Sequence, residues 1–169
     1  MTLFLIGMPG AGKTTFGKAL AAALNFPFTD LDAAVETQTG MTISALFQTG
    51  GEGAFREAES AALRGLDPAE ERVAATGGGI ILRPENVALL RRGRVIYIDR
   101  PLERIRGDID RAARPLLKTP GALEALWRER AHLYGAAAHA RVGNDGEKDV
   151  VLAALEAAAR ALLGKGDSA

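Results

Sequence analysis

Hydrophobic residues follow two spacings along this chain, and the two spacings alternate. Short hydrophobic runs predict strands at residues 2–6, 28–30, 73–76, 94–98 and 140–142. Stretches with hydrophobic residues every three or four positions predict helices at residues 14–24, 31–39, 42–48, 54–66, 84–91, 122–138 and 149–163, with a further helix opened by Pro101. Strands that alternate with helices predict an α/β fold, in which a parallel sheet carries helices on both faces.

The connections between these elements narrow the search for a functional site. In a parallel α/β sheet, ligands bind at the carboxyl ends of the strands. The stretch 107–121 is polar and basic and contains two prolines, so we expect a mobile loop there. No repeat, linker or low-complexity segment divides the chain, and we expect residues 1–169 to form a single domain.

Composition excludes several classes of site. The 169 residues include no cysteine and two histidines, which argues against disulfides, a cysteine nucleophile and a metal cluster built on these residues. Lys and Arg number 21 and so do Asp and Glu, whereas a general nucleic-acid binder carries a basic excess. No hydrophobic run approaches the ~18 residues of a membrane span, and the hydrophobic start is too short for a signal peptide. We therefore expect a cytoplasmic protein that binds neither nucleic acid nor membrane.

The most informative motif is Gly7-Met8-Pro9-Gly10-Ala11-Gly12-Lys13-Thr14, which matches the phosphate-loop pattern G-x-x-x-x-G-K-[ST] in full. It lies between a predicted strand and a predicted helix, as a phosphate loop does. We expect the Lys13 side chain to reach the β- and γ-phosphates and the Thr14 hydroxyl to bind Mg²⁺. The backbone is expected to cradle phosphate at Gly10, Ala11, Gly12, Lys13, Thr14 and Thr15. The motif predicts an ATP or GTP site and leaves the reaction open.

Two aspartates follow the second predicted strand. Alternation in an extended segment would place Asp30 and Asp32 on one side, facing the phosphate loop. One carboxylate would then hold Mg²⁺ through water or take a proton from an attacking hydroxyl, and the other would accept hydrogen bonds from substrate hydroxyls. The alternative is that one of the two aspartates caps the following helix.

Arginines and glycines mark four further positions. Arg56 falls in the first turn of a predicted helix, where an anion must compensate its charge, and Glu59 lies three residues on as a candidate ion-pair partner. Gly77-Gly78-Gly79 follows a strand directly, so either a group approaches the backbone closely or the chain turns tightly there. Arg114 in the basic loop either closes over a transferring phosphoryl group or stays solvated. Arg130 is a charge on an amphipathic helix, with a functional and a surface role equally open.

Taken in order, these stretches resemble the shikimate kinase family. The resemblance rests on residues 7–15, Asp30-x-Asp32, Gly53-x-Phe55-Arg56-x-x-Glu59, Ala75-Thr76-Gly77-Gly78-Gly79, Arg114-Pro115-Leu116-Leu117 and Arg130-x-x-x-Tyr134. It implies a nucleoside-monophosphate-kinase-like fold, a three-layer α/β/α arrangement with a five-stranded parallel sheet and a lid at about 107–121. It also implies that ATP, with Mg²⁺, phosphorylates the 3-hydroxyl of shikimate to give shikimate 3-phosphate, a step towards the aromatic amino acids.

The same resemblance implies a role for each matching residue. Shikimate would be bound by Asp32, Arg56, Gly77, Gly78, Gly79 and Arg130, with Arg106 on the adenine side and Arg114 as the lid arginine. The expected catalytic residues are Lys13, Asp30 and Arg114, and we favour a water-mediated metal contact over a base for Asp30. The chemistry agrees, because arginine forks bind a carboxylate and an ionised aspartate accepts from hydroxyls. We expect the protein to act as a monomer.

Two other functions would use part of this set. Another small-metabolite kinase, such as a gluconate kinase, would share the phosphate loop and the lid. It would not be expected to keep Arg56, the triple glycine and Arg130 together. A non-catalytic kinase-like sensor would be expected to lose active-site residues, whereas Lys13 and Thr14 are present.

Overall fold

The computed structural model describes residues 1–108, 115–117 and 119–164. Its five strands form one parallel sheet, as expected, and their order is β2-β3-β1-β4-β5. The strands are β1 (Thr2–Ile6), β2 (Phe28–Asp30), β3 (Arg72–Ala75), β4 (Arg94–Asp99) and β5 (Ala140–Gly143). Because all strands run the same way, their carboxyl ends meet along one edge of the sheet.

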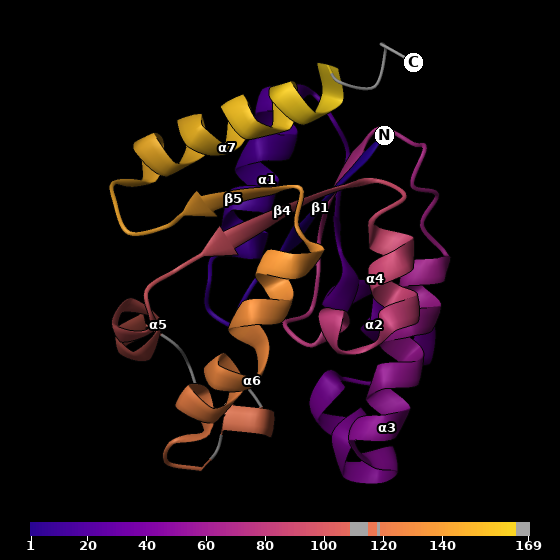
Figure 1. The fold of residues 1–169 in the computed structure, drawn as a ribbon. Coiled ribbons are helices and arrows are strands. Elements are labelled where there is room, and N and C mark those ends of the chain that lie inside the picture. The colour runs from indigo at the N-terminus through magenta and orange to yellow at the C-terminus, as the bar shows by residue number, and fades with distance from the viewer. Residues whose placement is uncertain (109–114, 118, 165–169) are drawn as a thin grey trace.

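Helices cover both faces of the sheet. They are α1 (Lys13–Leu24), α2 (Leu31–Thr39), α3 (Ile43–Arg64), α4 (Pro84–Leu90), α5 (Leu102–Asp108), α6 (Ala122–Ala137) and α7 (Lys148–Gly164), with short 3-10 helices η1 (Ile80–Leu82) and η2 (Pro115–Leu117). Helices α1 and α7 lie together on one face, and α6 lies on the other (Figure 1). The expected three-layer α/β/α architecture is therefore confirmed.

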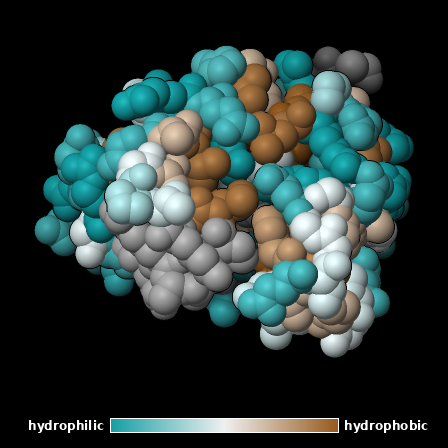
Figure 2. All heavy atoms as spheres, turned by 90° about the horizontal axis from the view of Figure 1, so that it is seen from below, coloured by the Kyte–Doolittle hydropathy of each residue, from teal (hydrophilic) through white to brown (hydrophobic). Residues whose placement is uncertain are grey.

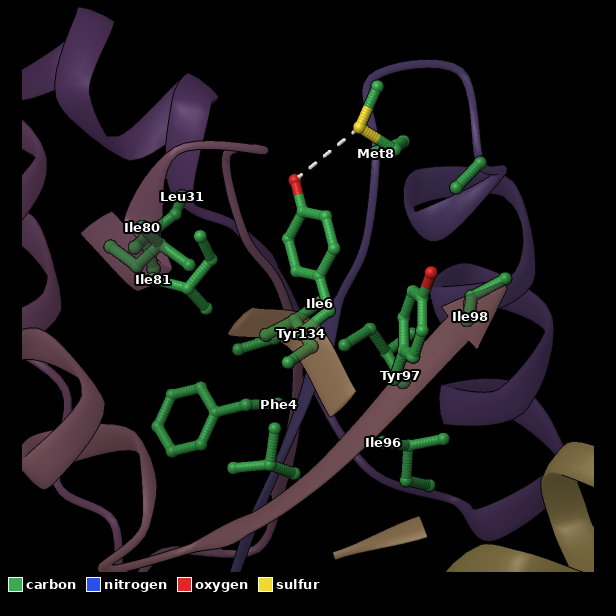
Figure 3. Close-up of a cluster of buried hydrophobic side chains, with 14 of the residues drawn as sticks. Phe4, Ile6, Met8, Leu31, Ile80, Ile81, Ile96, Tyr97, Ile98 and Tyr134 are labelled. Atoms are coloured by element: carbon green, nitrogen blue, oxygen red, sulfur yellow. Dashed lines mark hydrogen bonds between the residues drawn. The ribbon is translucent and has the colours of Figure 1, made fainter. Parts of the chain in front are cut away.

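Strands β1 and β4 are hydrophobic because both faces of the sheet are covered there. Every residue of β1 is buried, and so are residues 95–98 of β4. A strand in a covered parallel sheet has no solvent-facing side, which explains the continuous hydrophobic runs in the sequence. Each fully buried Leu or Ile contributes roughly 1.5–3 kcal/mol. Figure 3 shows Tyr134 of α6 beside Tyr97 of β4, with ring centroids 5.2 Å apart.

The two helices predicted at residues 42–48 and 54–66 are both present, within the element α3. They meet at a kink at Gly51, whose φ of 71° and ψ of −175° are not helical. This positive φ is accessible to glycine at little cost, so the chain changes direction there between the two helical halves. Thr42 caps the first half, and its hydroxyl accepts from the Ala45 N–H. The bend separates the capped half of α3 from the half that carries Arg56.

The other predicted strands and helices are confirmed, with ends that shift by one residue at most. The expected mobile loop at 107–121 falls partly outside the described residues and stays a prediction. Within the described part of the chain, no helix combines the length and the hydrophobicity needed to cross a bilayer.

Candidate active site

The phosphate-loop motif connects β1 to α1 at the carboxyl edge of the sheet. Gly12, at the N-terminus of α1, has φ 94° and ψ 13°, a left-handed conformation that explains the glycine at this position. Lys13 folds back over the loop, and its Nζ donates to the carbonyls of Gly7 and Met8, both at 2.9 Å. The side chain is largely buried. The loop therefore holds its own lysine at the place where a bound phosphate would lie.

Asp30 caps the following helix, one of the two alternatives, and it also contacts the phosphate loop. Its Oδ1 accepts from the N–H groups of Asp32 (3.0 Å) and Ala33 (3.4 Å), which caps α2. Its Oδ2 accepts from the Thr14 hydroxyl at 2.7 Å. A hydroxyl and a carboxylate in contact are oxygen ligands of the kind that Mg²⁺ prefers, and this ion commonly uses one or two carboxylates together with substrate phosphates. The residues present thus fit a magnesium ion bound with a nucleotide.

Asp32 does not share the orientation of Asp30, so the prediction that both face the phosphate loop was wrong. Alternation applies to extended chain, but the cap at Asp30 starts α2, and Asp32 lies in its first helical turn. Asp32 instead lines a cavity beside the loop, where its Oδ1 is 3.0 Å from the place that a Cβ on Gly77 would take. The two carboxylates therefore serve different parts of the site.

The cavity beside the phosphate loop has a volume of about 510 Å³. It lies between α3 and α6, which project from the sheet at the lower right and lower centre of Figure 1. Its charged residues are Asp32, Glu36, Arg56, Glu59 and Arg130. Its apolar residues include Phe47, Phe55, Leu116, Leu117 and Leu126. The face seen in Figure 2 carries a band of hydrophobic residues between hydrophilic regions. The lining suits a small ligand with charged and apolar parts.

Arg56 lines this cavity and also forms the ion pair that was the alternative to a binding role. Its Nη1 donates to Glu59 Oε2 at 2.8 Å, and its Nη2 to Glu52 Oε1 at 3.1 Å. The guanidinium carbon lies 5.0 Å from the centroid of the Phe55 ring. Glu59 is fully buried, and burial raises its pKa while Arg56 acts in the opposite direction. The carboxylates thus hold the guanidinium rigidly at the cavity wall.

The triple glycine is explained by the protein's own side chains. A Cβ on Gly79 would lie 2.3 Å from Nη1 and Nη2 of Arg56, and one on Gly77 would lie 2.3 Å from Glu59 Oε1. A Cβ on Gly78 would lie 2.8 Å from Pro9 Cδ in the phosphate loop. Both interpretations hold, because the chain also turns here, with the Ile80 N–H donating to the Gly77 carbonyl at 3.3 Å. A larger residue at these positions would push the Glu59 carboxylate, the Arg56 guanidinium or the phosphate loop out of place.

Arg130 is a buried charge in the cavity wall with a weak ion pair. Its side chain is 3% exposed, and its ion pair among the described residues joins Nε to Glu129 Oε1 over 3.9 Å. That Nε has no hydrogen-bond partner in the described part of the chain. A buried guanidinium that is incompletely paired is expected to bind an anion, because leaving it unpaired is costly.

Tyr134 links α6, which carries this arginine, to the triple-glycine segment, a role that sequence reasoning missed. Its hydroxyl donates to the Gly78 carbonyl at 2.5 Å and contacts Met8 Sδ at 3.9 Å, the contact dashed in Figure 3. Burial raises the pKa of the Tyr134 hydroxyl, and the nearby Arg130 charge acts in the opposite direction. The hydroxyl therefore stays protonated and joins α6 to the triple-glycine segment and to the phosphate loop. The spacing Arg130-x-x-x-Tyr134 was the available signal, since such residues share a helix face.

We expect Tyr134→Phe to weaken substrate binding without unfolding the protein. Phenylalanine keeps the ring but leaves the Gly78 carbonyl without its donor, so the affinity for the cavity ligand should fall by about 5- to 30-fold. Isothermal titration with the cavity ligand measures the loss of affinity, and thermal unfolding checks that the variant stays folded. Tyr97→Phe, which removes a hydroxyl bonded to Asp99 outside the cavity, is the matched control. Equal effects of the two changes would contradict the role of Tyr134.

Three predicted site residues remain: Arg106, Arg114 and Thr15. Arg106 Nε and Nη2 both donate to Glu124 Oε1, at 3.0 and 2.7 Å, so this half-exposed side chain joins α5 to α6. Its expected place near adenine stays a prediction. Arg114 lies outside the described residues. Thr15 is exposed at the start of α1.

Two contacts to the phosphate loop were not anticipated from the sequence. Arg100 Nη1 donates to the Gly10 carbonyl, and Asn144 Nδ2 donates to the Ala11 carbonyl, both at 2.9 Å. Each residue directly follows a strand, β4 or β5, at the edge where ligands bind. That position was the signal that could have singled them out.

Known proteins are similar to this chain in both sequence and fold. The family model described as "Shikimate kinase" matches residues 9–160. A shikimate kinase of Clostridium botulinum is 44% identical over 152 residues, which cover 89% of this chain and 92% of the relative. One of Synechococcus elongatus is 40% identical over 156 residues, with coverages of 88% and 80%.

Solved structures agree with the sequence comparisons. The shikimate kinase of Acinetobacter baumannii in complex with shikimate superposes with a TM-score of 0.88 and 34% identity, covering 95% of this chain and 93% of that one. The enzyme of Aquifex aeolicus gives a TM-score of 0.82 at 34% identity, with coverages of 96% and 99%. The sheet order, the phosphate loop and the cavity lined by buried arginines thus occur together with similarity over nearly the whole chain, and the chain belongs to the shikimate kinase family.

Proposed function

We propose that this protein transfers the γ-phosphoryl group of ATP to the 3-hydroxyl of shikimate, giving ADP and shikimate 3-phosphate. The observation that carries the proposal is the cavity beside the phosphate loop, with Arg56 and Arg130 buried in its wall. A carboxylate ligand satisfies such guanidinium groups, and shikimate carries one carboxylate and three hydroxyls. The Acinetobacter baumannii relative has been solved in complex with shikimate.

The substrate would be oriented by groups on opposite walls of the cavity. The spare donors of Arg130 and the guanidinium of Arg56 bind the carboxylate, which places a fixed anchor away from the reacting hydroxyl. Asp32 accepts hydrogen bonds from ring hydroxyls, because an ionised aspartate offers only acceptors. The segment Gly77–Gly79 lets the ring approach the backbone. This positioning is the main contribution, since the phosphoryl-transfer transition state is loose and needs little covalent help.

The nucleotide would be held by the residues around the phosphate loop. Backbone N–H groups of the loop bind the phosphates, and Lys13 stabilises the charge that develops on the transferring group. Thr14 and Asp30 hold the magnesium ion that accompanies ATP and neutralises part of the phosphate charge, Thr14 directly and Asp30 through water. Asp30 is engaged by Thr14 and by the start of α2, which favours this contact over the role of a base. Arg106 on the adenine side and Arg114 over the phosphates complete the proposed set.

The wider organisation is also part of the proposal. One continuous hydrophobic core supports a single kinase domain with a lid at about 107–121. The equal numbers of basic and acidic residues support a partner that is a small molecule rather than a nucleic acid. We propose a monomeric enzyme of the cytoplasm, with no membrane partner.

A coupled assay of ADP release tests the proposed activity. With MgATP, shikimate should stimulate ADP release far more than gluconate, glycerol or quinate at equal concentration, because these do not match both the carboxylate and the hydroxyl positions. Phosphorus NMR of the product should show a new phosphate monoester on shikimate. Equal stimulation by gluconate would overturn the substrate assignment, and tight shikimate binding without turnover would indicate a sensor.

A further inference from the structure

The phosphate loop is held from outside by two side chains that no step of the proposed reaction uses. Arg100 follows β4 and Asn144 follows β5, and the two strands pair through Asp99 and Gly143. The Asn144 N–H continues this pairing by donating to the Asp99 carbonyl at 2.8 Å. Both residues are therefore placed by the sheet rather than by a flexible loop. Strand β4 is next to β1, which leads into the phosphate loop, and β5 is next to β4.

The two side chains bond to consecutive peptide groups of the loop. Arg100 donates to the Gly10 carbonyl and Asn144 to the Ala11 carbonyl. A peptide group is planar and its N–H points opposite to its C=O, so a fixed carbonyl also fixes the N–H of the next residue. Asn144 thus sets the direction of the Gly12 N–H. Arg100 sets the peptide whose N–H, on Ala11, donates to the Met8 carbonyl at 3.1 Å.

The neighbourhood of each side chain supports a fixed position. The second nitrogen of the Arg100 fork, Nη2, forms an ion pair with Asp108 at the end of α5, which holds the guanidinium in one orientation. On the other side, a Cβ on Gly12 would lie 3.1 Å from Asn144 Nδ2, so the amide is packed directly against the loop. Ordering these groups before the ligand binds lowers the cost of binding.

We infer that Asn144 and Arg100 are positioning residues for the nucleotide phosphates: Asn144 directs the Gly12 N–H towards the phosphate, and Arg100 holds the loop turn that the Ala11 N–H closes on the Met8 carbonyl. The inference rests on the proposed nucleotide site. It concerns binding of the β-phosphate rather than of adenine or of the second substrate. ADP and AMP share adenine and differ in the β-phosphate, so comparing their affinities distinguishes this role from a contact to adenine.

Asn144→Ala is the central test, because it removes the donor without changing the charge near the phosphates. The dissociation constant for MgADP, measured by isothermal titration, should rise by about 2- to 10-fold. The affinities for AMP, which has no β-phosphate, and for shikimate should stay close to those of the unchanged protein. Arg100→Ala should act in the same direction, whereas Arg104→Ala, an exposed arginine on α5, should leave all three affinities unchanged.

Each outcome decides the question. Equal loss of ADP and AMP affinity would mean that Asn144 contacts adenine. Equal loss of ADP and shikimate affinity would mean that Asn144 has a general structural role. Either result overturns the inference, and so does an unchanged affinity for ADP. If Asn144→Ala does not fold, Asn144→Ser and Arg100→Ala are judged by the same comparison. Direct ADP binding keeps this test separate from the proposed function, which fails only if shikimate is not phosphorylated.

Discussion

Replacing Lys13 with alanine is expected to lower kcat by about 10²- to 10³-fold, the cost of removing one well-placed donor from a transition state. The ammonium group lies inside the phosphate loop, within 2.9 Å of the carbonyls of Gly7 and Met8. Because charge shifts towards the leaving oxygen as the phosphoryl group is transferred, this donor stabilises the transition state more than the bound substrates, and the effect should fall on kcat more than on the KM for shikimate. Steady-state kinetics with both substrates varied checks this.

The Lys13 result needs a control for the loop itself, since the same ammonium group also holds two loop carbonyls. Lys18→Ala removes an exposed lysine from the same helix and should leave kcat unchanged. Thermal unfolding of Lys13→Ala should show a much smaller change than its activity. Normal turnover by Lys13→Ala would contradict the assigned role, and loss of the folded state would assign the lysine to loop structure instead.

The second large effect is expected at Arg56. Arg56→Ala should raise the KM for shikimate by about 10- to 150-fold, the value of a hydrogen bond between charged groups. The structure adds that the same change should destabilise the protein, by about 3–5 kcal/mol, because it leaves the buried Glu59 carboxylate without its partner. Arg64→Ala, at an exposed position on α3, is the matched control and should change neither quantity.

A double variant separates the two roles of Arg56. Arg56→Met together with Glu59→Gln removes the charge that loses its partner, so stability should recover while the KM for shikimate stays high. In Arg56→Ala alone, burial holds the pKa of Glu59 above its ordinary value. Protonated Glu59 is the form that the folded state favours, so the stability deficit should shrink as the pH is lowered through this pKa and grow as the pH rises. A shikimate KM that recovers with stability would assign Arg56 to structure alone.

The part of the site that sequence reasoning placed correctly is local. Gly12, Lys13 and Thr14 are adjacent in the chain, and a strand before them and a helix after them determine how the loop folds. The cap at Thr42 and the pairing of Arg56 with Glu59 also follow from spacing within one helix, and both are present. These predictions succeeded because every partner lies within a few residues.

The prediction that failed needed to know where a strand ends and a helix begins. Asp30 and Asp32 were expected on one side of a strand, but the cap at Asp30 turns the chain into α2 after it. The hydrophobic pattern was interpreted correctly there, and the error came from a single backbone conformation that the pattern does not report. The two helices predicted around Gly51 are present and are joined by a kink at that glycine.

The spacing of residues along the sequence could not predict which distant segments are in contact. The guanidinium of Arg56 packs on Gly79, the Tyr134 hydroxyl bonds to Gly78, and Asn144 bonds to Ala11, which lies 133 residues earlier. The alternatives for the triple glycine could not be resolved before these contacts were known. The residue types were visible, but the contacts that give them a role exist only once the sheet is assembled.

The sequence by itself determined the α/β class, the phosphate loop and the residue types that suit an anionic, hydroxylated substrate, because these depend on local spacing and side-chain chemistry. Only the tertiary structure decided that Arg130 faces the cavity with a spare donor, that Asp32 lies apart from Asp30, and that strands β4 and β5 send side chains to the phosphate loop. The physical reason is the strand order β2-β3-β1-β4-β5, which sets neighbours by packing rather than by position along the chain.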